Sequence, residues 1–429
     1  MRMSRVSLAL VLLIAVVAFG VTACGDEEKS SSTSAAAPSA TAATAASAPK
    51  CGDGSGKAAT GEPIPVGGMM TASNGPDISQ GPEAAKAFFD CLNANGGIKG
   101  RPVQYTYEDD GLNPATAARA AGSLVNDKKV VAVVGSTAYL ECAVAGPIYE
   151  KAGLMEVEAA GGPAQCFTLP NIVSVSQGGI LSTSLAVQDQ IAAGAKKIAL
   201  LGPNTPGLGQ AFIDAAKRTA AANGGQLVAG ILHKPGIRDA TSVLLDAADA
   251  KPDAIVLVGV EQDLVSILKA AEAQNMKGRF KFAAAAPLYS PSAPKALGQY
   301  WTNGAIRVAH QFAPFGAGTT DNQLWHAVMA KYAPDTVEDE FAQGAFLSAK
   351  IFADTVAGID GPITRATVAK ALQSIKDYKT DLLCEPWSWV TGKYHVSNTT
   401  GRIATINADG EWEDVGGCTA IKDPILAGS

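Results

Sequence analysis

The chain has 429 residues, and its 34 Lys and Arg against 40 Asp and Glu give a net charge of −6 at neutral pH. It has no basic stripe and no interleaving of basic with aromatic residues, so nucleic-acid binding is not expected. The length behind the N-terminal segment exceeds what one hydrophobic core normally needs and favours two lobes.

Residues 1–23 predict an export signal. Arg2 and Arg5 give a positive start, and the apolar run 6–19 is too short to span a bilayer, which takes about 20 residues. The run ends in Val-Thr-Ala-Cys at 21–24, which resembles the lipobox of bacterial lipoproteins. By that resemblance Cys24 becomes the lipidated N-terminus. The alternative is a plain secretory signal with an incidental cysteine.

A disordered tether is expected for residues 24–62. Most of its first part, 25–49, is Ala, Ser, Thr and Pro, which offers too little apolar surface to offset chain entropy. Lipid on Cys24 would hold the following domain close to a membrane surface.

Strand-like and helix-like segments alternate from residue 64 onward. β-branched runs predict the strands, and apolar residues spaced by three and four predict the helices. The first half reads strand 64–70, helix 83–95, strand 103–108, helix 114–126, strand 130–134, helix 140–152 and strand 154–158. The second half reads helix 179–193, strand 198–201, helix 208–223, strand 227–232, helix 240–250, strand 254–258, helix 263–274 and strand 280–284. Such alternation requires parallel sheets covered by helices on both faces.

The remaining third is less regular. We expect a strand at 305–310, helices at 322–332, 338–357 and 363–374, and short C-terminal strands that include 402–406. No apolar run after the signal is long enough to cross a membrane.

Short motifs recur about 125 residues apart. Ala-Asn-Gly-Gly at 94–97 returns at 222–225, and Gly111 before Ala-Thr at 115–116 returns as Gly236 before Ala-Thr at 240–241. An apolar run that ends in Gly135 returns as one that ends in Gly259. Three matches in register indicate two similarly folded halves, and two halves leave a cleft in which a ligand can bind.

Six cysteines remain after Cys24, an even number that favours disulfides in an exported protein. The sequence does not fix their connectivity, and one or two thiols could stay free. We favour local pairs: Cys142 with Cys166, Cys384 with Cys418, and Cys51 with Cys91. There is no CxxC and no His at metal spacing from a cysteine, so no metal site is expected.

The stretch Leu-Asn-Ala-Asn-Gly-Gly-Ile-Lys-Gly-Arg-Pro at 92–102 is the most specific in the chain. With Glu108-Asp109-Asp110 one strand later, Pro114 opening the next helix, and Tyr-Glu-Lys-Ala-Gly at 149–153, it resembles the branched-chain amino-acid-binding (Leu/Ile/Val-binding) family. These are type I periplasmic solute-binding proteins of ABC transporters. The resemblance covers most of 64–314 and thins out beyond it.

The resemblance implies an α/β fold of two doubly wound parallel-sheet lobes joined by a three-strand hinge. The N-terminal lobe would take 63–183 and 314–400, and the C-terminal lobe 184–313 and 401–429. It further implies a small-molecule solute (an amino acid, amide or carboxylate), an ABC permease as partner, an extracytoplasmic location with the membrane reached through the lipid, no cofactor, and a monomer.

Ligands of open parallel sheets bind beyond the carboxyl ends of the strands, so the loops after the strands are the candidate site. The candidate ligand-binding residues are Ser73, Asn74, Ser136, Thr137, Tyr139, Ala160, Gly161, Pro206, Glu261, Asp263 and Tyr289. The first-lobe loops carry no acid and offer hydroxyl and N–H groups that suit a carboxylate. The second-lobe loop carries Glu261 and Asp263, which suit an ammonium group, and the resemblance aligns Asp263 with the family's amine-binding acid.

Each candidate has a simpler structural explanation. Ser136 and Thr137 could cap the next helix, and acids in the first turn of a helix are favoured by its dipole alone. Tyr139 and Tyr289 could be ordinary loop aromatics. Pro206 departs from the family, which commonly has an aromatic at this point, so an aliphatic amino acid is less favoured as the solute and another small amide, carboxylate or aromatic becomes possible.

Enzyme motifs are weak or missing in the sequence. Gly207-x-Gly209 is half of a dinucleotide fingerprint, no P-loop lysine follows a Gly-rich loop, and there is no Gly-x-Ser-x-Gly elbow. The four histidines lie outside any recognisable triad pattern. We therefore expect a lipid-anchored solute-binding subunit of an importer and not an enzyme. The alternatives are a ligand sensor of the same fold that signals to a membrane receptor, and an exported hydrolase.

Overall fold

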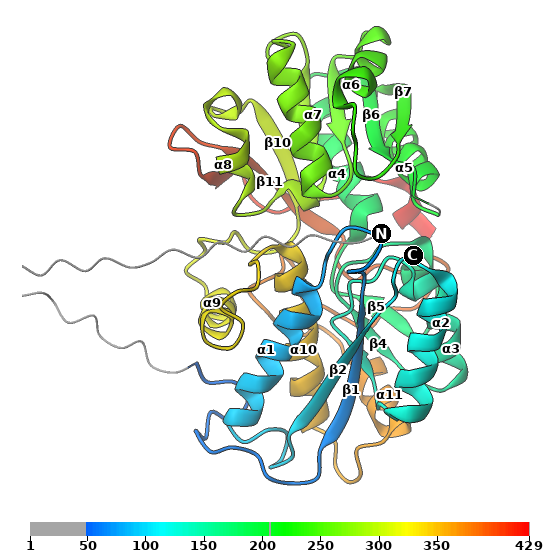
Figure 1. The fold of residues 1–429 in the computed structure, drawn as a ribbon, viewed down its shortest axis with the longest axis vertical. Helices are drawn as coiled ribbons and strands as arrows, with labels where there is room; N and C mark the ends of the chain where they lie inside the picture. Colours follow the sequence, from blue (N-terminus) through cyan, green and yellow to red (C-terminus); the bar gives the residue numbers. More distant parts are fainter. Residues whose placement is uncertain (1–48, 206, 429) are drawn as a thin grey trace, which may run out of the picture. The chain divides into compact units, whose positions relative to one another are not determined.

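The protein is described by a computed structural model covering residues 49–205 and 207–428. Two sheets organise these residues (Figure 1). The first has five parallel strands in the order β2-β1-β3-β4-β5. The second has eight strands, with parallel β7, β6, β8, β9 and β10 followed at one edge by antiparallel β11 and β12, and with β13 paired to β11.

The strands are short, as is usual in buried parallel sheets. Those of the first sheet are β1 (Ile64–Met70), β2 (Val103–Asp109), β3 (Val133–Val134), β4 (Glu156–Glu158) and β5 (Ile172–Ser174). Those of the second are β6 (Lys197–Pro203), β7 (Gln226–His233), β8 (Ala254–Leu257), β9 (Lys281–Ala284), β10 (Ile306–His310), β11 (Thr400–Ile406), β12 (Trp412–Asp414) and β13 (Thr419–Ala420).

Helices cover each sheet and define two lobes. The first lobe carries α1 (Gln80–Ala94), α2 (Pro114–Gly122), α3 (Gly146–Lys151), α9 (Thr320–Tyr332), α10 (Glu340–Ala357) and α11 (Arg365–Gln373). The second lobe carries α4 (Gly178–Ala192), α5 (Gly209–Ala222), α6 (Ala240–Asp249), α7 (Glu261–Ala273) and α8 (Ala293–Leu297). The α/β fold with parallel-sheet lobes is the one that the sequence predicts.

Strand alternation places helices on both faces of the second sheet. In β6, Ile198 and Leu200 are buried in one core with residues of α4 and α5, whereas Ala199 and Leu201 are buried in another core with residues of α6 and α7. Successive side chains of a strand point to opposite faces, so one apolar run supplies both cores.

The first lobe joins chain segments that are distant in sequence. Helix α1 lies beside α10 (Figure 1), and the Phe88 ring meets Phe346 edge-on with centroids 5.2 Å apart. Phe89 meets Phe352 in the same way at 6.1 Å. This aromatic contact fixes the helices that return after the second lobe onto the first sheet.

The repeated motifs occupy equivalent places in the two lobes. Asn95 and Asn223 end α1 and α5, and each side-chain amide donates to a carbonyl one turn back, Cys91 O and Thr219 O, at 2.8 Å. Gly135 and Gly259 follow β3 and β8 with φ of 71° and 148°. The duplication read from the sequence is therefore a duplication of structure.

The chain passes between the lobes at 175–177, 311–319 and 374–399. These crossings are irregular connections, whereas the expected hinge consisted of strands. A disulfide joins Cys384 in the third crossing to Cys418 beside β13. The other two disulfides join Cys51 to Cys91 and Cys142 to Cys166, so all three predicted pairs are present.

The expected tether is corrected at its C-terminal end. The structure attaches residues 49–62 to the first lobe, since Cys51 is buried in its core and bonded to Cys91. The N–H groups of Ala59 and Gly61 donate to Asn93 O and Gly100 O, both at 2.8 Å. The rest of the predicted tether, the export signal and Cys24 lie outside the described residues.

Two elements escaped the sequence analysis. Strand β5 has only three residues, and α8 is a single turn between loops, so neither produces a periodic signal. Over the described part of the chain, no helix is both long and apolar enough to cross a membrane.

Candidate functional site

A cavity of about 860 Å³ lies where the carboxyl ends of strands from both sheets meet. The loop after β3 supplies Thr137 and Tyr139, and the loop after β4 supplies Ala160 and Gly161. The second lobe supplies Pro203 at the end of β6 and Val260 after β8. Its position agrees with the general rule for open parallel sheets.

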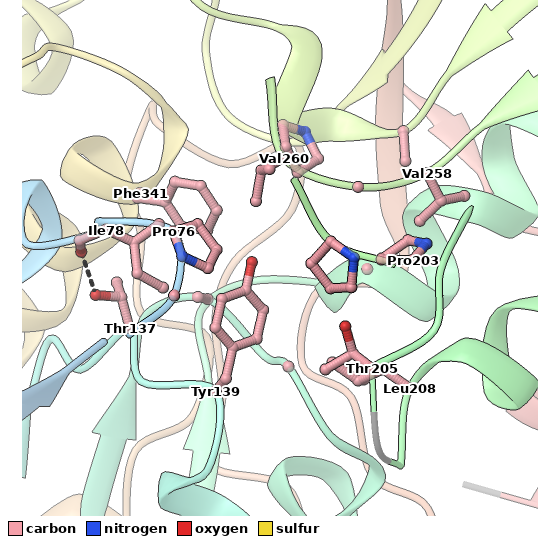
Figure 2. A pocket seen from close by; sticks show the side chains of 18 of the residues that line it. Pro76, Ile78, Thr137, Tyr139, Pro203, Thr205, Leu208, Val258, Val260 and Phe341 are labelled. Carbon is pink, nitrogen blue, oxygen red and sulfur yellow. Dashed lines mark hydrogen bonds between the residues drawn. The ribbon is translucent and has the colours of Figure 1, made fainter. Parts of the chain in front are cut away.

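Most of the cavity wall is apolar, and Figure 2 shows how these side chains face one another. The Tyr139 ring stands in the middle of the view, with Pro76 and Phe341 on one side and Pro203 on the other. The larger apolar side chains on the wall include Pro76, Ile78, Leu112, Leu140, Pro203, Leu208, Phe212, Val258, Val260, Pro287 and Phe341. A solute that fills this space must bury apolar surface of its own.

Tyr139 combines an aromatic face with a hydroxyl group. Its backbone N–H donates to Thr71 Oγ1 at 2.9 Å, which fixes the loop. Burial raises the pKa of the Tyr139 hydroxyl to about 12, with the charges of Asp263 and Asp110 adding to the effect. The hydroxyl therefore keeps its proton at physiological pH and remains able to donate a hydrogen bond.

Asp263 reaches the cavity from the first turn of α7 and also holds a neighbouring loop. Its carboxylate accepts hydrogen bonds from the N–H groups of Gly236 at 3.0 Å and Ile237 at 2.9 Å. Two acceptor positions are thus used inside the lobe. The remaining lone pairs and the negative charge are available to a solute.

Glu340 is a second acid on the cavity wall, at the start of α10. Its side chain is buried, and Gln311 Nε2 donates to one carboxyl oxygen over a long 3.4 Å. Burial raises the pKa of Glu340 to about 8, and the nearby Asp339 adds to this. At neutral pH the carboxyl therefore holds a proton that an incoming cation could displace.

The orientation of Gln311 is fixed by its other end. Its carbonyl oxygen accepts from Ser176 Oγ at 3.0 Å and from the N–H of Gln177 at 2.6 Å. The amide nitrogen is left to face Glu340. One side chain thus joins the first crossing, the second crossing and α10 beside the cavity.

Six of the predicted binding residues line the cavity. They are Asn74, Thr137, Tyr139, Ala160, Gly161 and Asp263. Thr137 presents little polarity, because its hydroxyl donates to Ile78 O at 2.7 Å (Figure 2).

Four predicted residues lie away from the cavity wall. Ser136 is fully buried, where it accepts from the N–H of Met69 and donates to Glu141, each at 3.0 Å. Glu261 accepts a hydrogen bond from Ser292 at 2.6 Å outside the cavity, and Ser73 is an exposed loop residue. Pro206 lies outside the described residues.

Tyr289 is the fourth predicted residue that lies away from the cavity wall, after Ser136, Glu261 and Ser73. It is buried and stacks on His310, with ring centroids 3.9 Å apart, and on Phe315 at 4.5 Å. Its position after β9 suggested the cleft, but the chain turns the ring into the core of the second lobe.

The role of the first-lobe loops in binding a carboxylate stays a prediction, and some of their N–H groups are used within the lobe. The N–H groups of Ala160 and Gly161 donate to the carboxylate of Glu158, each at 2.7 Å to the same oxygen. The N–H of Leu140 donates to Asp110 at 3.0 Å. These donors are thus occupied by acids of the first lobe itself.

Three residues of the cavity wall, Glu340, Phe341 and Gln311, were not among the predicted ones. Glu340 and Phe341 begin α10, which follows another helix and not a strand, whereas Gln311 directly follows β10, a strand whose end was not considered as part of the site. The available signal for Glu340 was a pair of acids, Asp339 and Glu340, at the start of a long apolar helix. Within the described ranges, no cluster of three or more His, Cys, Asp or Glu could hold a metal ion.

Residues 63–411 match the model of the periplasmic binding protein family. An amino acid binding protein of Pseudomonas aeruginosa is 31% identical over 94 residues, which cover 22% of this chain and 25% of that protein. The alignment with this relative therefore spans about a quarter of its length.

Solved structures share the fold at low identity. A possible leucine/isoleucine/valine-binding protein from Rhodopirellula baltica has a TM-score of 0.69 at 20% identity, over 83% of this chain and 96% of that one. A fatty acid ABC transporter substrate-binding protein from Thermomonospora curvata has a TM-score of 0.71 at 19% identity, over 86% and 95%. A solute-binding protein from R. palustris, in complex with 4-hydroxybenzoate, has a TM-score of 0.69 at 18% identity, over 84% and 98%.

The family and these neighbours are solute-binding proteins and not enzymes. The paired parallel-sheet lobes, the cavity between them and the match over residues 63–411 agree with one another. This chain therefore belongs to the periplasmic binding protein family, in its type I form.

Proposed function

We propose that this protein is the solute-binding subunit of an ABC importer, held outside the cell by a lipid on Cys24, and that it captures a small solute as a monomer by cleft closure. The observation that supports this is the cavity of about 860 Å³, which takes its walls from both lobes. A solute that contacts both walls favours the closed arrangement over the open one.

The moving parts proposed here are residues 63–183 with 314–400 and residues 184–313 with 401–429. The three irregular crossings between them give each lobe its freedom to rotate. The closed form would then be presented to the membrane permease.

The solute is proposed to be small and polar at one end. The cavity volume lies in the range of small-molecule sites, roughly 300–1,000 Å³, and its apolar wall favours a solute with a sizeable apolar body. The names of the similar proteins mention leucine, isoleucine and valine, 4-hydroxybenzoate and fatty acid. Because these solutes belong to different chemical classes, the class that this protein binds has to be inferred from the walls of its own cavity.

A thermal-shift screen tests solute capture. Amino acids, amides, amines and small carboxylates are offered to the purified chain, and we expect a saturable rise in Tm with at least one of them. Tyr139→Ala should weaken the binding of that solute about tenfold, because an aromatic ring of the cavity wall is lost. Tyr107→Ala, on β2 outside the cavity, is the matched control and should leave binding unchanged. Silence of the whole library would count against the proposal.

Membrane fractionation tests the anchor. The full chain, expressed in a bacterial host, should sediment with the membrane, and mass spectrometry should show acyl groups on Cys24. Cys24→Ala should release the protein from the membrane fraction while solute binding persists. If the unaltered chain is fully soluble, the lipid anchor is wrong and a plain secretory signal takes its place.

A further inference from the structure

The side chains on the cavity wall that can carry a charge are acids. Two carboxyl groups, Asp263 and Glu340, face the cavity, and the described residues of its wall include no Lys, Arg or His. A negatively charged solute group would be desolvated beside Asp263, with no cation among the described wall residues to balance it. The wall is complementary to a positive group instead.

Glu340 has an acceptor position that no group of the described residues fills. Its side chain is 6% exposed, and the hydrogen bond from Gln311 at 3.4 Å is the one recorded for its carboxyl in the described part of the chain. Gln311 can come no nearer without breaking its contacts to Ser176 and Gln177 at 3.0 and 2.6 Å. The second carboxyl oxygen is left without a partner, beside the apolar wall that Phe341 continues.

Several backbone donors that could hold a carboxylate are occupied. Glu158 takes the N–H groups of Ala160 and Gly161, and Asp110 takes that of Leu140. At the amino end of α4, which also borders the cavity, the N–H of Gly178 donates to Ser176 Oγ at 2.9 Å. At these positions a solute carboxylate would have to displace the internal acceptors.

We infer that the solute is an amine with an apolar body and no carboxylate, and that its ammonium group binds the open oxygen of Glu340 while Asp263 adds a second negative charge. This inference rests on the proposed function and names the solute class of the same cavity. Tyr139 provides an aromatic face on which such a cation can lie. The remaining apolar wall packs around the body of the solute.

Binding of this kind is coupled to a proton. The pKa of Glu340 is raised to about 8, so below that pH the ammonium must expel the carboxyl proton before it can bind. The Kd of the amine should therefore rise about tenfold for each unit by which the pH falls below 8. The charged and titratable groups around it are Asp339 on its own helix and, on the same cavity wall, Asp263 and Tyr139. Gln311 is neutral throughout.

Matched solutes test the inference. Hexylamine, hexanoate, hexanol and norleucine share one chain length, as do 3-phenylpropylamine, hydrocinnamate, 3-phenylpropanol and phenylalanine for an aromatic body. Binding is measured by thermal shift and calorimetry at pH 7 and pH 9. We expect an amine to bind at least about tenfold more tightly than its alcohol, carboxylate and amino-acid counterparts, and more tightly at pH 9.

Variants separate the contribution of the Glu340 carboxyl to binding from that of the rest of the cavity. Glu340→Gln should weaken the amine at least about tenfold, abolish its pH dependence and leave the alcohol unchanged. Glu150→Gln removes an exposed acid on α3, away from the cavity, and should change nothing. The pH dependence of the unaltered protein gives the same answer without any variant, should Glu340→Gln fold poorly.

The other outcomes are equally clear. If a carboxylate or an amino acid binds best, or if the amine binds equally well to Glu340→Gln, the inference is overturned while solute capture stands. If no class of solute in the broad screen raises Tm, solute capture itself fails, and the inference fails with it.

Discussion

Glu158 ends β4 with a buried carboxyl that accepts the N–H groups of Ala160 and Gly161 beside the cavity. Two further buried glutamates, Glu141 and Glu156, lie close by, and the charge of Glu158 makes the ionisation of both more costly. Burial raises the pKa of Glu158 to about 7 and raises the pKa of the other two well above their usual range. The loop next to the cavity thus depends on an acid that titrates near neutrality.

This acid predicts a pH dependence of stability. The folded pKa of Glu158 exceeds its ordinary value of 4.5, so the folded state holds more protons than the unfolded one between about pH 4.5 and 7, and the free energy of unfolding falls as pH rises through that window. Glu158→Gln should gain roughly 3 kcal/mol relative to the unaltered protein between pH 4.5 and 8. Urea denaturation at several pH values measures this.

The matched control for Glu158→Gln is the exposed Glu150 on α3. Glu150→Gln should track the unaltered protein at every pH. A constant difference between Glu158→Gln and the unaltered protein across the range would show that the carboxyl does not titrate as proposed.

At the scale of elements, the two repeated glycines end strands where the chain must turn. A Cβ on Gly135, whose φ is 71°, would lie 2.8 Å from Ala85 Cβ and 3.3 Å from Ala345 O. Gly153 has nearly the same φ of 70°, and a Cβ added there would meet no atom within 4 Å. A comparison of alanine variants at Gly135 and Gly153 therefore separates the cost of backbone strain from the cost of crowding.

We expect Gly135→Ala to lower the free energy of unfolding by roughly 2–4 kcal/mol, from strain and overpacking together. Gly153→Ala should cost only about 1–2 kcal/mol, from strain alone. Urea denaturation of both variants gives the two values. Equal losses of free energy of unfolding in the two variants would mean that α1 and α10 make room for the added methyl group at little cost.

The segment 49–62 gives a second test at this scale. Without the bond from Cys51 to Cys91, hydrogen bonds such as that from Ala59 to Asn93 must hold it alone. Replacing both cysteines by Ser should cost roughly 2–4 kcal/mol and speed tryptic cleavage after Lys57. The same change at Cys142 and Cys166 should leave Lys57 as protected as before, and faster cleavage in both variants would point to global loosening instead.

Most elements could be predicted because their signals are local. The periodic helices and the apolar strands keep their type, and β1 keeps even its bounds, Ile64–Met70. Much of the cleft could not be predicted, since the direction of a side chain depends on tertiary packing. Ser136 and Tyr289 lie in loops that follow strands, as predicted, but their side chains point into the protein core. Glu340 reaches the cavity from α10, which follows another helix and not a strand.

At the scale of the whole molecule, Gln311 couples the hinge to the cavity. It joins Ser176 and Gln177 in one crossing to Glu340 on α10. Gln311→Leu leaves these buried groups unsatisfied and should cost roughly 1–3 kcal/mol in urea denaturation. The radius of gyration from X-ray scattering should then respond less to solute, because the hinge has lost its link to the site.

Gln274→Leu, at the exposed end of α7, is the control for Gln311→Leu. It should keep both the stability and the scattering response of the unaltered protein. A normal response in Gln311→Leu would show that closure is governed by contacts elsewhere.

The bond between Cys384 and Cys418 has a consequence for survival outside the cell. Cys384 lies beside Leu382 and Leu383 of the first-lobe core, and Cys418 lies next to β13 at the second sheet, so the bond closes a covalent ring that includes residues 384–399 of the third crossing. A protease that nicks the backbone within this ring produces two pieces that remain one molecule. The bond thus protects the protein against single cuts in that part of its longest connection, a safeguard that forms in an oxidising space.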